Sequence, residues 1–363
     1  MRRTDQELAP NTPDLPGNPP PGPDRETKEI HVSTKNSWRK LAAIALIAPL
    51  VGLSACSSQG GKAPAAGDVS QGEAAVSMPK LKIALITHAA PGDTFWDIVR
   101  KGAEEASAKD NVDLQYLSDP EGGRQAQLIE QAVDQGVDGI AVTLAKPDAL
   151  ASALKKAEAA GIPVVSLNAG EDRFKELGAF THFGSNEKLA GAAVGEKLDE
   201  DGFKHPVCVI QEQGHVGLEN RCAGVKEKIP ATEILYVQGT DMTQVQSTVT
   251  AKLQATKSVD SIIGLGAPYT LTILKSVAAA NSSAKVASFD MNPELAQKIV
   301  DGDIIFTVDQ QPWLQGYGAI DSLWQNKRGG FEIGGGQPVL TGPTIIAKDS
   351  AKDVLEFAKQ GVR

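Results

Sequence analysis

Seven short segments of the 363-residue chain combine amides, carboxylates and aromatic side chains, and each follows a stretch with the apolar pattern of a β-strand. They are residues 88–96, 168–170, 213–221, 240–242, 266–269, 290–292 and 309–311. Amides and carboxylates form paired hydrogen bonds with vicinal hydroxyls, and an aromatic face packs on the C–H face of a sugar ring. This mixture predicts a site for a neutral polyhydroxylated ligand. Alternatively, these residues are ordinary turn formers and helix N-caps, as Asp290 and Asn292 before Pro293 would be.

The first of these segments belongs to the stretch of residues 81–102, around which we expect the fold to be organised. An apolar run at 81–86 predicts a buried strand, and the helical spacing of apolar residues after Trp96 predicts an amphipathic helix. The turn between them places Asp93, Phe95 and Trp96 beyond the carboxyl end of the strand, where ligands bind in open α/β sheets. Phe95 and Trp96 either line a site there or cap the core.

The rest of the folded part alternates strand-like and helix-like segments. Further strands are predicted at 112–117, 139–144, 163–167, 180–183, 206–211, 233–237, 261–265, 285–289 and 304–308. Helical patterns fill the gaps, as at 125–135 and 150–160. Such alternation is typical of parallel sheets covered on both faces. About ten strands are many for one doubly wound sheet, so we predict an α/β fold with two lobes.

The N-terminal part has the pattern of an exported lipoprotein. Residues 1–37 are rich in Pro, Asp, Glu and Asn and are predicted to be disordered. Arg39 and Lys40 precede an apolar run at 41–53, which is too short to span a bilayer but suits a signal-peptide core. Leu53-Ser54-Ala55-Cys56 then resembles the lipobox of bacterial lipoproteins, although Cys56 after small residues is also possible by chance. We therefore expect a leader at 1–56, acylation of Cys56, a flexible tether at 57–78 and an extracytoplasmic protein anchored to the membrane.

Charge and cysteine placement add two expectations. The formal net charge of −9 argues against nucleic acid as a partner, because phosphate binding needs clustered Lys and Arg. Cys208 lies in an apolar strand, and Cys222 shares a helical face with Leu218 and Val225 that must pack on the same sheet. In an exported domain this juxtaposition predicts a disulfide. The alternative is two buried free cysteines.

Five segments, in this order and spacing, resemble the ribose/galactose-type sugar-binding proteins of ABC transporters, over about residues 80–343. They are TFWDIVRKGAEEA, QAQLIEQAVDQGVDGIAV, ALKKAEAAGIPVVSLNA, ASFDMNPE and DGDIIFTVDQQPWLQGYGA. The resemblance implies the type I periplasmic-binding-protein fold, in which two Rossmann-like lobes joined by three hinge crossings close on one sugar. We place the crossings near 185–186, 310–311 and 339–340. The lobes would then be 79–185 with 311–339 and 186–310 with 340–363, and we expect a monomer.

The same resemblance assigns ligand contacts to nine residues. They are Asp93, Phe95, Trp96, Asn168, His215, Arg221, Met242, Asp290 and Gln310. Asp290 matches an aspartate that chelates a sugar diol, Gln310 an amide at the hinge, and Met242 a position where an aromatic is common. Residues 264–268, GLGAP, stand where the family usually shows an Asn-Asp pair, which leaves the sugar open. The calcium loop of the galactose binders has no counterpart at 201–206, so neither a metal nor a cofactor is implied.

The expected function is capture of a monosaccharide or related polyol and its delivery to the permease subunits of an ABC importer. An enzyme is the first competing class, but HExxH, Walker A and GxSxG motifs are absent from the sequence and its five histidines show no metal-ligand spacing. His182 is predicted to be an interior residue. The leader and the lack of a helix-turn-helix pattern exclude a repressor of the same fold. A surface sensor that presents its sugar-bound form to a signalling receptor stays open as an alternative.

Overall fold

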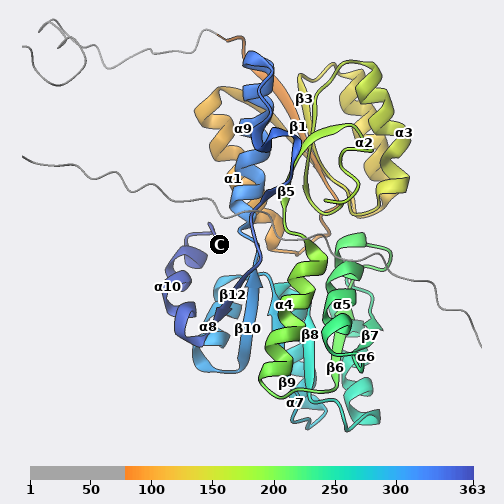
Figure 1. The fold of residues 1–363 in the computed structure, drawn as a ribbon, viewed down its shortest axis with the longest axis vertical. Coiled ribbons are helices and arrows are strands. Elements are labelled where there is room, and N and C mark those ends of the chain that lie inside the picture. The colour runs from red at the N-terminus through yellow and green to blue at the C-terminus, as the bar shows by residue number, and fades with distance from the viewer. Residues whose placement is uncertain (1–77) are drawn as a thin grey trace, which may run out of the picture. The chain divides into compact units, whose positions relative to one another are not determined.

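The computed structural model describes residues 78–363, which contain two six-stranded sheets, each covered by helices (Figure 1). The predicted leader, the lipobox cysteine and the tether up to residue 77 lie outside the described residues. None of the helices in the described part combines the length and apolar character needed to cross a membrane.

The first sheet has the strand order β2-β1-β3-β4-β5-β11, and all neighbours are parallel. Its strands are β1 (Leu81–Thr87), β2 (Val112–Ser118), β3 (Gly139–Thr143), β4 (Val164–Asn168), β5 (Ala179–Gly184) and β11 (Val339–Leu340). The covering helices are α1 (Phe95–Asp110), α2 (Gly122–Asp134), α3 (Pro147–Ala159) and α9 (Pro312–Gly329). Separate apolar clusters fill the two faces of the sheet, one under α1 and α9 and one under α2 and α3.

The second sheet repeats this order as β7-β6-β8-β9-β10-β12. Its strands are β6 (Pro206–Ile210), β7 (Glu233–Tyr236), β8 (Ser261–Gly264), β9 (Lys285–Phe289), β10 (Ile304–Asp309) and the antiparallel β12 (Thr344–Ala347). Its helices are α4 (Glu187–Glu200), α5 (Val216–Lys228), α6 (Met242–Ala255), α7 (Ala267–Ala279), α8 (Pro293–Asp301) and α10 (Lys348–Lys359). The predicted fold of two doubly wound lobes is therefore confirmed.

The chain passes between the sheets at three places. After β5 it enters α4, which packs on α5 of the second lobe, and after β10 it enters α9, which packs on α1 of the first lobe. The third passage lies between β11 in the first sheet and β12 in the second, at residues 341–343. In both sheets the strand order reverses beside the first strand, and ligands of doubly wound sheets bind at the carboxyl ends of the strands near such a reversal.

Candidate functional site

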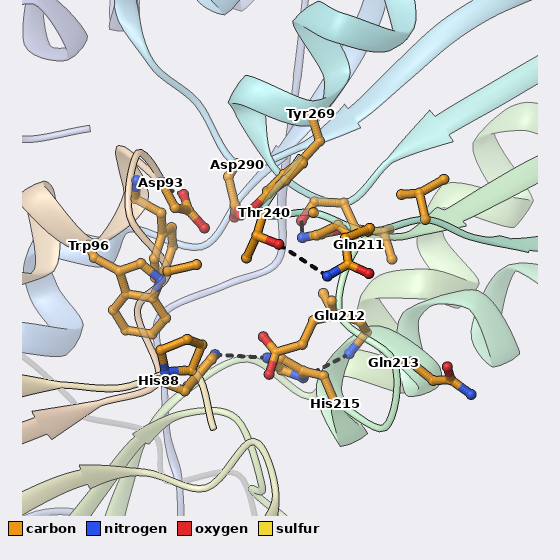
Figure 2. Close-up of a pocket in the computed structure, with 18 of the residues that line it drawn as sticks. His88, Asp93, Trp96, Gln211, Glu212, Gln213, His215, Thr240, Tyr269 and Asp290 are labelled. Carbon is orange, nitrogen blue, oxygen red and sulfur yellow. Dashed lines mark hydrogen bonds between the residues drawn. The ribbon is translucent and has the colours of Figure 1, made fainter. Parts of the chain in front are cut away.

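A cavity of about 440 Å³ lies at the carboxyl ends of the strands, with lining residues from both lobes (Figure 2). Its size is within the range of small-molecule sites. The predicted contacts that line it are Asp93, Phe95, Trp96, Asn168, His215, Arg221, Asp290 and Gln310. These residues are spread over about 220 positions of the sequence, and the repeated strand order brings them together.

The first lobe contributes a carboxylate and two aromatic rings. Asp93 lies in the turn between β1 and α1, where its Oδ1 accepts a hydrogen bond from the Phe95 backbone N–H at 3.1 Å. Phe95 and Trp96 open α1, and their ring centroids lie 5.0 Å apart in an edge-to-face arrangement. Both rings also belong to the buried apolar cluster under α1. Both alternatives given by the sequence therefore apply, because these aromatic rings cap the core and also line the cavity.

The second lobe contributes a buried guanidinium whose charge is already paired. Arg221 on α5 donates from Nε and Nη2 to the two carboxylate oxygens of Glu187, at 2.6 and 3.0 Å. Its Nη1 donates to the Leu265 carbonyl at 3.2 Å and lies 3.9 Å from Asp290 Oδ2. The guanidinium carbon lies 4.6 Å from the centre of the Phe289 ring. This bidentate pairing fixes the guanidinium plane beside the cavity and leaves Asp290 with only a weak ionic partner.

Amide side chains connect this aspartate to the chain crossing. Gln310 donates from Nε2 to Asp290 Oδ1 at 2.5 Å, and Gln315 of α9 donates to Gln310 Oε1 at 3.3 Å. Asn168 of β4 lies at the end of this series, 3.5 Å from Gln315 Oε1. Asn168 and Asp290 both have a left-handed backbone, with φ of 66° and 64°. Asn and Asp tolerate this conformation best, and such strain is typical of functional sites.

The pKa values of both cavity aspartates are raised. Burial is the main cause in each, and it brings the pKa of Asp93 to about 6 and that of Asp290 to about 7. Hydrogen bonds from the Phe95 N–H and Gln310, together with the Arg221 charge, act in the opposite direction without cancelling the effect of burial. Both carboxylates are largely shielded from solvent and receive few hydrogen bonds from the protein. They therefore favour a ligand that supplies hydrogen-bond donors.

Two histidines meet between the lobes. His215 is the N-cap of α5, where its Nδ1 accepts from the backbone N–H groups of Gly217 and Leu218 at 3.1 and 3.3 Å. The neutral ring must then carry its proton on Nε2, which lies 3.0 Å from His88 Nε2. His88 Nδ1 in turn lies 2.7 Å from Thr143 Oγ1. The consistent assignment is a chain in which His215 donates to His88 and His88 donates to Thr143.

The same two rings and Glu212 have the spacing of a metal site. One ligand atom from each lies within 4.8 Å of the others, and the donor types suit zinc. A metal on His215 Nε2 would require the proton on Nδ1, which caps α5 as an acceptor. Burial lowers the pKa of His88 to about 3 and that of His215 well below its ordinary value, so both rings are neutral, as the hydrogen-bonded assignment requires. The chemistry of this set favours a hydrogen-bonded histidine pair.

Two further contacts join the lobes beside the histidine pair. Lys146 Nζ, at the start of α3, lies 2.9 Å from Glu212 Oε1, which follows β6. The Val216 backbone N–H donates to the Ala145 carbonyl at 3.0 Å. The lysine and the glutamate were not named from the sequence, and His88 was named only as the first residue of the segment 88–96 and not as a ligand contact. Each of the three follows a predicted strand. Their position after β1, β3 and β6 was the available signal.

Two residues singled out in the sequence lie elsewhere. Met242, an expected ligand contact, does not line the cavity; it is the first residue of α6, about one-third exposed, with Sδ 3.7 Å from Thr272 Oγ1. The N-cap Asp241 fixes that helix start by accepting from two backbone N–H groups, and Met242 thereby faces α7. His182 is fully buried in β5 with Nδ1 2.9 Å from Ser166 Oγ, as expected of an interior residue.

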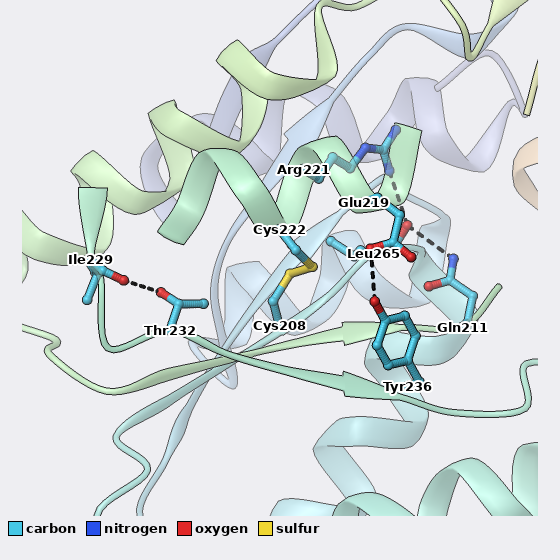
Figure 3. Close-up of a disulfide and its surroundings, with 9 residues drawn as sticks. All are labelled: Cys208, Gln211, Glu219, Arg221, Cys222, Ile229, Thr232, Tyr236 and Leu265. Atoms are coloured by element: carbon cyan, nitrogen blue, oxygen red, sulfur yellow. Dashed lines mark hydrogen bonds between the residues drawn. A yellow bond between two sulfur atoms is a disulfide. The ribbon is translucent and has the colours of Figure 1, made fainter. Parts of the chain in front are cut away.

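A disulfide holds the helix that carries Arg221. Cys208 of β6 and Cys222 of α5 are bonded, with the sulfur atoms 2.02 Å apart (Figure 3). Both side chains are fully buried. The predicted bridge is confirmed, and it ties α5 to its sheet one residue after Arg221.

Comparison with known proteins identifies the family. A family model described as a periplasmic binding protein domain matches residues 83–330. The chain belongs to the periplasmic binding protein family. The resemblance stated from the sequence is thereby confirmed. The solved structures that are similar to this chain include a carbohydrate transporter from Acidothermus cellulolyticus 11B, crystallised in complex with myo-inositol. It is 49% identical, with a TM-score of 0.78 over 78% of this chain and 100% of that chain.

Less similar relatives match over comparable lengths of the chain. A solute-binding protein from Burkholderia graminis C4D1M in complex with D-arabinose is 27% identical, with a TM-score of 0.67 over 74% of this chain and 96% of that chain. The xylose/arabinose-binding protein XylF of Sulfolobus acidocaldarius is 24% identical over 260 residues, which cover 66% of this chain and 64% of that protein. The chain thus spans somewhat less than two thirds of XylF. These relatives are solute-binding proteins rather than enzymes.

Proposed function

We propose that the protein captures a neutral monosaccharide or cyclic polyol between its lobes and delivers it to an ABC importer. The observation that carries the proposal is a pair of carboxylates, the half-buried Asp93 and the buried Asp290, which enter one cavity from opposite lobes. Hydroxyl groups are the donors that such carboxylates lack, and the Phe95–Trp96 pair offers an apolar surface for the C–H groups of a ring.

The charges around the cavity favour a neutral ligand over an anionic one. Asp93, Glu212 and Asp290 bring carboxylates to its wall. The cations are already paired, Arg221 with Glu187 and Lys146 with Glu212. A sugar phosphate or a uronate would meet like charges and find no free cation among these residues, which costs binding energy.

The relatives point to the same class of ligand. The Acidothermus protein was crystallised with myo-inositol and the Burkholderia protein with D-arabinose, and XylF is named for xylose and arabinose. All are small neutral molecules with a hydroxyl on most carbons. Because the Acidothermus protein is far more similar in sequence to this chain than the other two relatives are, myo-inositol is the first compound to test.

Binding would use both lobes at once. Each lobe holds part of the polar set, so only the arrangement with both lobes on the ligand offers every contact, and the ligand shifts the population toward it. A permease would then distinguish loaded from empty protein by shape. Export, acylation of Cys56, membrane anchorage and the permease partner rest on the sequence pattern and the family. A receptor that responds to the loaded form is the alternative partner.

A thermal-shift screen of neutral monosaccharides, polyols and anionic sugars tests the proposal. A ligand at 100 times its Kd stabilises the native state by about 2.7 kcal/mol, which corresponds to a rise of several degrees in Tm. We expect such a rise with at least one cyclic polyol or monosaccharide. No response to any neutral compound, or a response to anionic sugars alone, would contradict the proposed function.

A further inference from the structure

The side chain of Tyr269 enters the cavity from the first turn of α7. This helix begins directly after β8, so its first turn lies at the carboxyl end of the second sheet. Tyr269 is only 4% exposed and lines the cavity. Figure 2 shows its ring pointing toward Thr240 and Asp290, on the side opposite the histidine pair.

Two glycines make room for the ring. A Cβ atom added at Gly266 would lie 2.9 Å from Tyr269 Cδ2, and one added at Gly239 would lie 3.1 Å from Tyr269 Cε1. Both distances are shorter than ordinary contacts between carbon atoms. A larger residue at either position would displace the ring, so the backbone after β7 and β8 holds the phenol in one place.

The Tyr269 hydroxyl has no hydrogen-bond partner among residues 78–363. Burial raises the pKa of Tyr269, and the charges of Asp93 and Glu212 raise it further. The hydroxyl is therefore neutral at any physiological pH. It is an uncharged group in a cavity that is also lined by carboxylates from both lobes. Unlike an ionised carboxylate, which only accepts hydrogen bonds, a phenol both donates and accepts.

We propose that Tyr269 is a specificity-determining residue that hydrogen-bonds one hydroxyl of a bound cyclic polyol. The inference rests on the proposed function and deepens it. A ring hydroxyl that accepts from Tyr269 is free to donate to a neighbouring carboxylate, and such linked hydrogen bonds strengthen each other. A ligand without that hydroxyl would leave the phenol unpaired in a buried site, so it is rejected.

Titration calorimetry of the full chain and of Tyr269→Phe tests this, with myo-inositol and its monodeoxy analogues as probes. The ring and its packing remain in the variant, and no internal hydrogen bond is lost, so the Tm of the ligand-free protein should not change. We expect myo-inositol to bind about three- to tenfold more weakly to Tyr269→Phe, the effect of one hydrogen bond. One monodeoxy analogue should bind wild type and variant equally, which identifies the hydroxyl that contacts Tyr269.

Tyr116→Phe is the matched control. It removes the same oxygen atom from a tyrosine whose hydroxyl lies 3.1 Å from Thr87 Oγ1 and which does not line this cavity. Its affinity for myo-inositol should equal that of wild type. If Tyr269→Phe and wild type bind myo-inositol with equal affinity and rank the analogues in the same order, the proposed role of Tyr269 is wrong, while the proposed function stands. If wild type binds neither myo-inositol nor any analogue, the polyol class fails, and the inference fails with it.

Discussion

The two cavity aspartates favour ligand binding but lower the stability of the ligand-free protein. Burial raises the pKa of Asp93 to about 6 and that of Asp290 to about 7, so both carboxylates are partly or wholly ionised at pH 7 to 8 in a site that disfavours their charge. A ligand rich in hydroxyl donors would relieve this cost. The ligand-free protein retains it, as is common for functional sites that hold desolvated groups ready.

Asp290→Asn should therefore stabilise the ligand-free protein, and more so at high pH. Because the folded pKa of Asp290 lies above its ordinary value of 3.8, this group contributes stability at low pH that is lost as the pH rises through about 7. Asparagine does not titrate. The quantity to compare is the free energy of unfolding of the variant minus that of wild type. We expect this difference to be about 1 to 3 kcal/mol larger at pH 8 than at pH 5. Urea unfolding at the two pH values measures this difference.

The control for this experiment is Asp301→Asn, at an exposed position at the end of α8. Its difference from wild type should be the same at both pH values. If the Asp290→Asn difference is also independent of pH, the carboxylate is not desolvated as described.

At the scale of elements, two helix pairs cover corresponding faces of the lobes, and both pairs approach through glycines. A Cβ at Gly102 of α1 would lie 2.1 Å from the Trp313 carbonyl oxygen, and one at Gly316 of α9 would lie 1.9 Å from that of Val99. In the second lobe, a Cβ at Gly191 of α4 would lie 1.9 Å from the Arg221 carbonyl oxygen. The backbones are too close for any side chain at these positions.

Gly191→Ala should destabilise the protein and weaken ligand binding together. The added methyl group meets backbone, which cannot turn aside, so α5 must shift and move Arg221 with it. Overpacking of this kind costs about 1 to 3 kcal/mol or more, which denaturant unfolding would show. Gly123→Ala in α2 is the control, because a Cβ there meets nothing within 4 Å and alanine favours a helix. Equal stability of the two variants would contradict the close approach of α4 and α5.

The disulfide should contribute measurably to the second lobe. Replacing Cys208 and Cys222 together by alanine removes a bridge between residues 14 apart, and we expect a loss of about 3 kcal/mol in the chain-entropy model. Urea unfolding of the double variant under non-reducing conditions measures this loss. Two free thiols in the mass spectrum of the unreduced wild-type protein would show that the bridge is not formed.

Strand–helix alternation in the sequence predicted most of the strands and the segments that follow their carboxyl ends. Within those segments the resemblance to the sugar-binding family selected nine residues, and all of them except Met242 line the cavity. The alternation missed β11, whose two residues are too short to show a pattern, and β12, which runs directly into α10 without an intervening turn. Glu187 and Gln315 were missed for another reason. They act through Arg221 and Gln310 from helices in other parts of the chain, and only the folded arrangement brings these partners together.

At the scale of the whole molecule, the proposed mechanism depends on the lobes meeting across the ligand. The contacts available for this arrangement are Lys146 with Glu212, His88 with His215, and the Val216 N–H with the Ala145 carbonyl. Ligand should shift the population toward the arrangement that makes them. We expect the radius of gyration from small-angle scattering to fall on saturation with the bound sugar or polyol. An unchanged radius at saturation would mean that binding does not bring the lobes together.

Titration calorimetry of wild type and Asp290→Ala with the compound that raises Tm most tests the proposed binding mechanism most directly. In that mechanism the Asp290 carboxylate accepts hydrogen bonds from the ligand out of water, and charge-assisted bonds of this kind contribute about 1.5 to 3 kcal/mol each. Wild type should bind one molecule per chain, and Asp290→Ala should lose about two to four powers of ten in affinity. Full affinity in Asp290→Ala would contradict the mechanism, because the ligand would then lie somewhere other than this cavity.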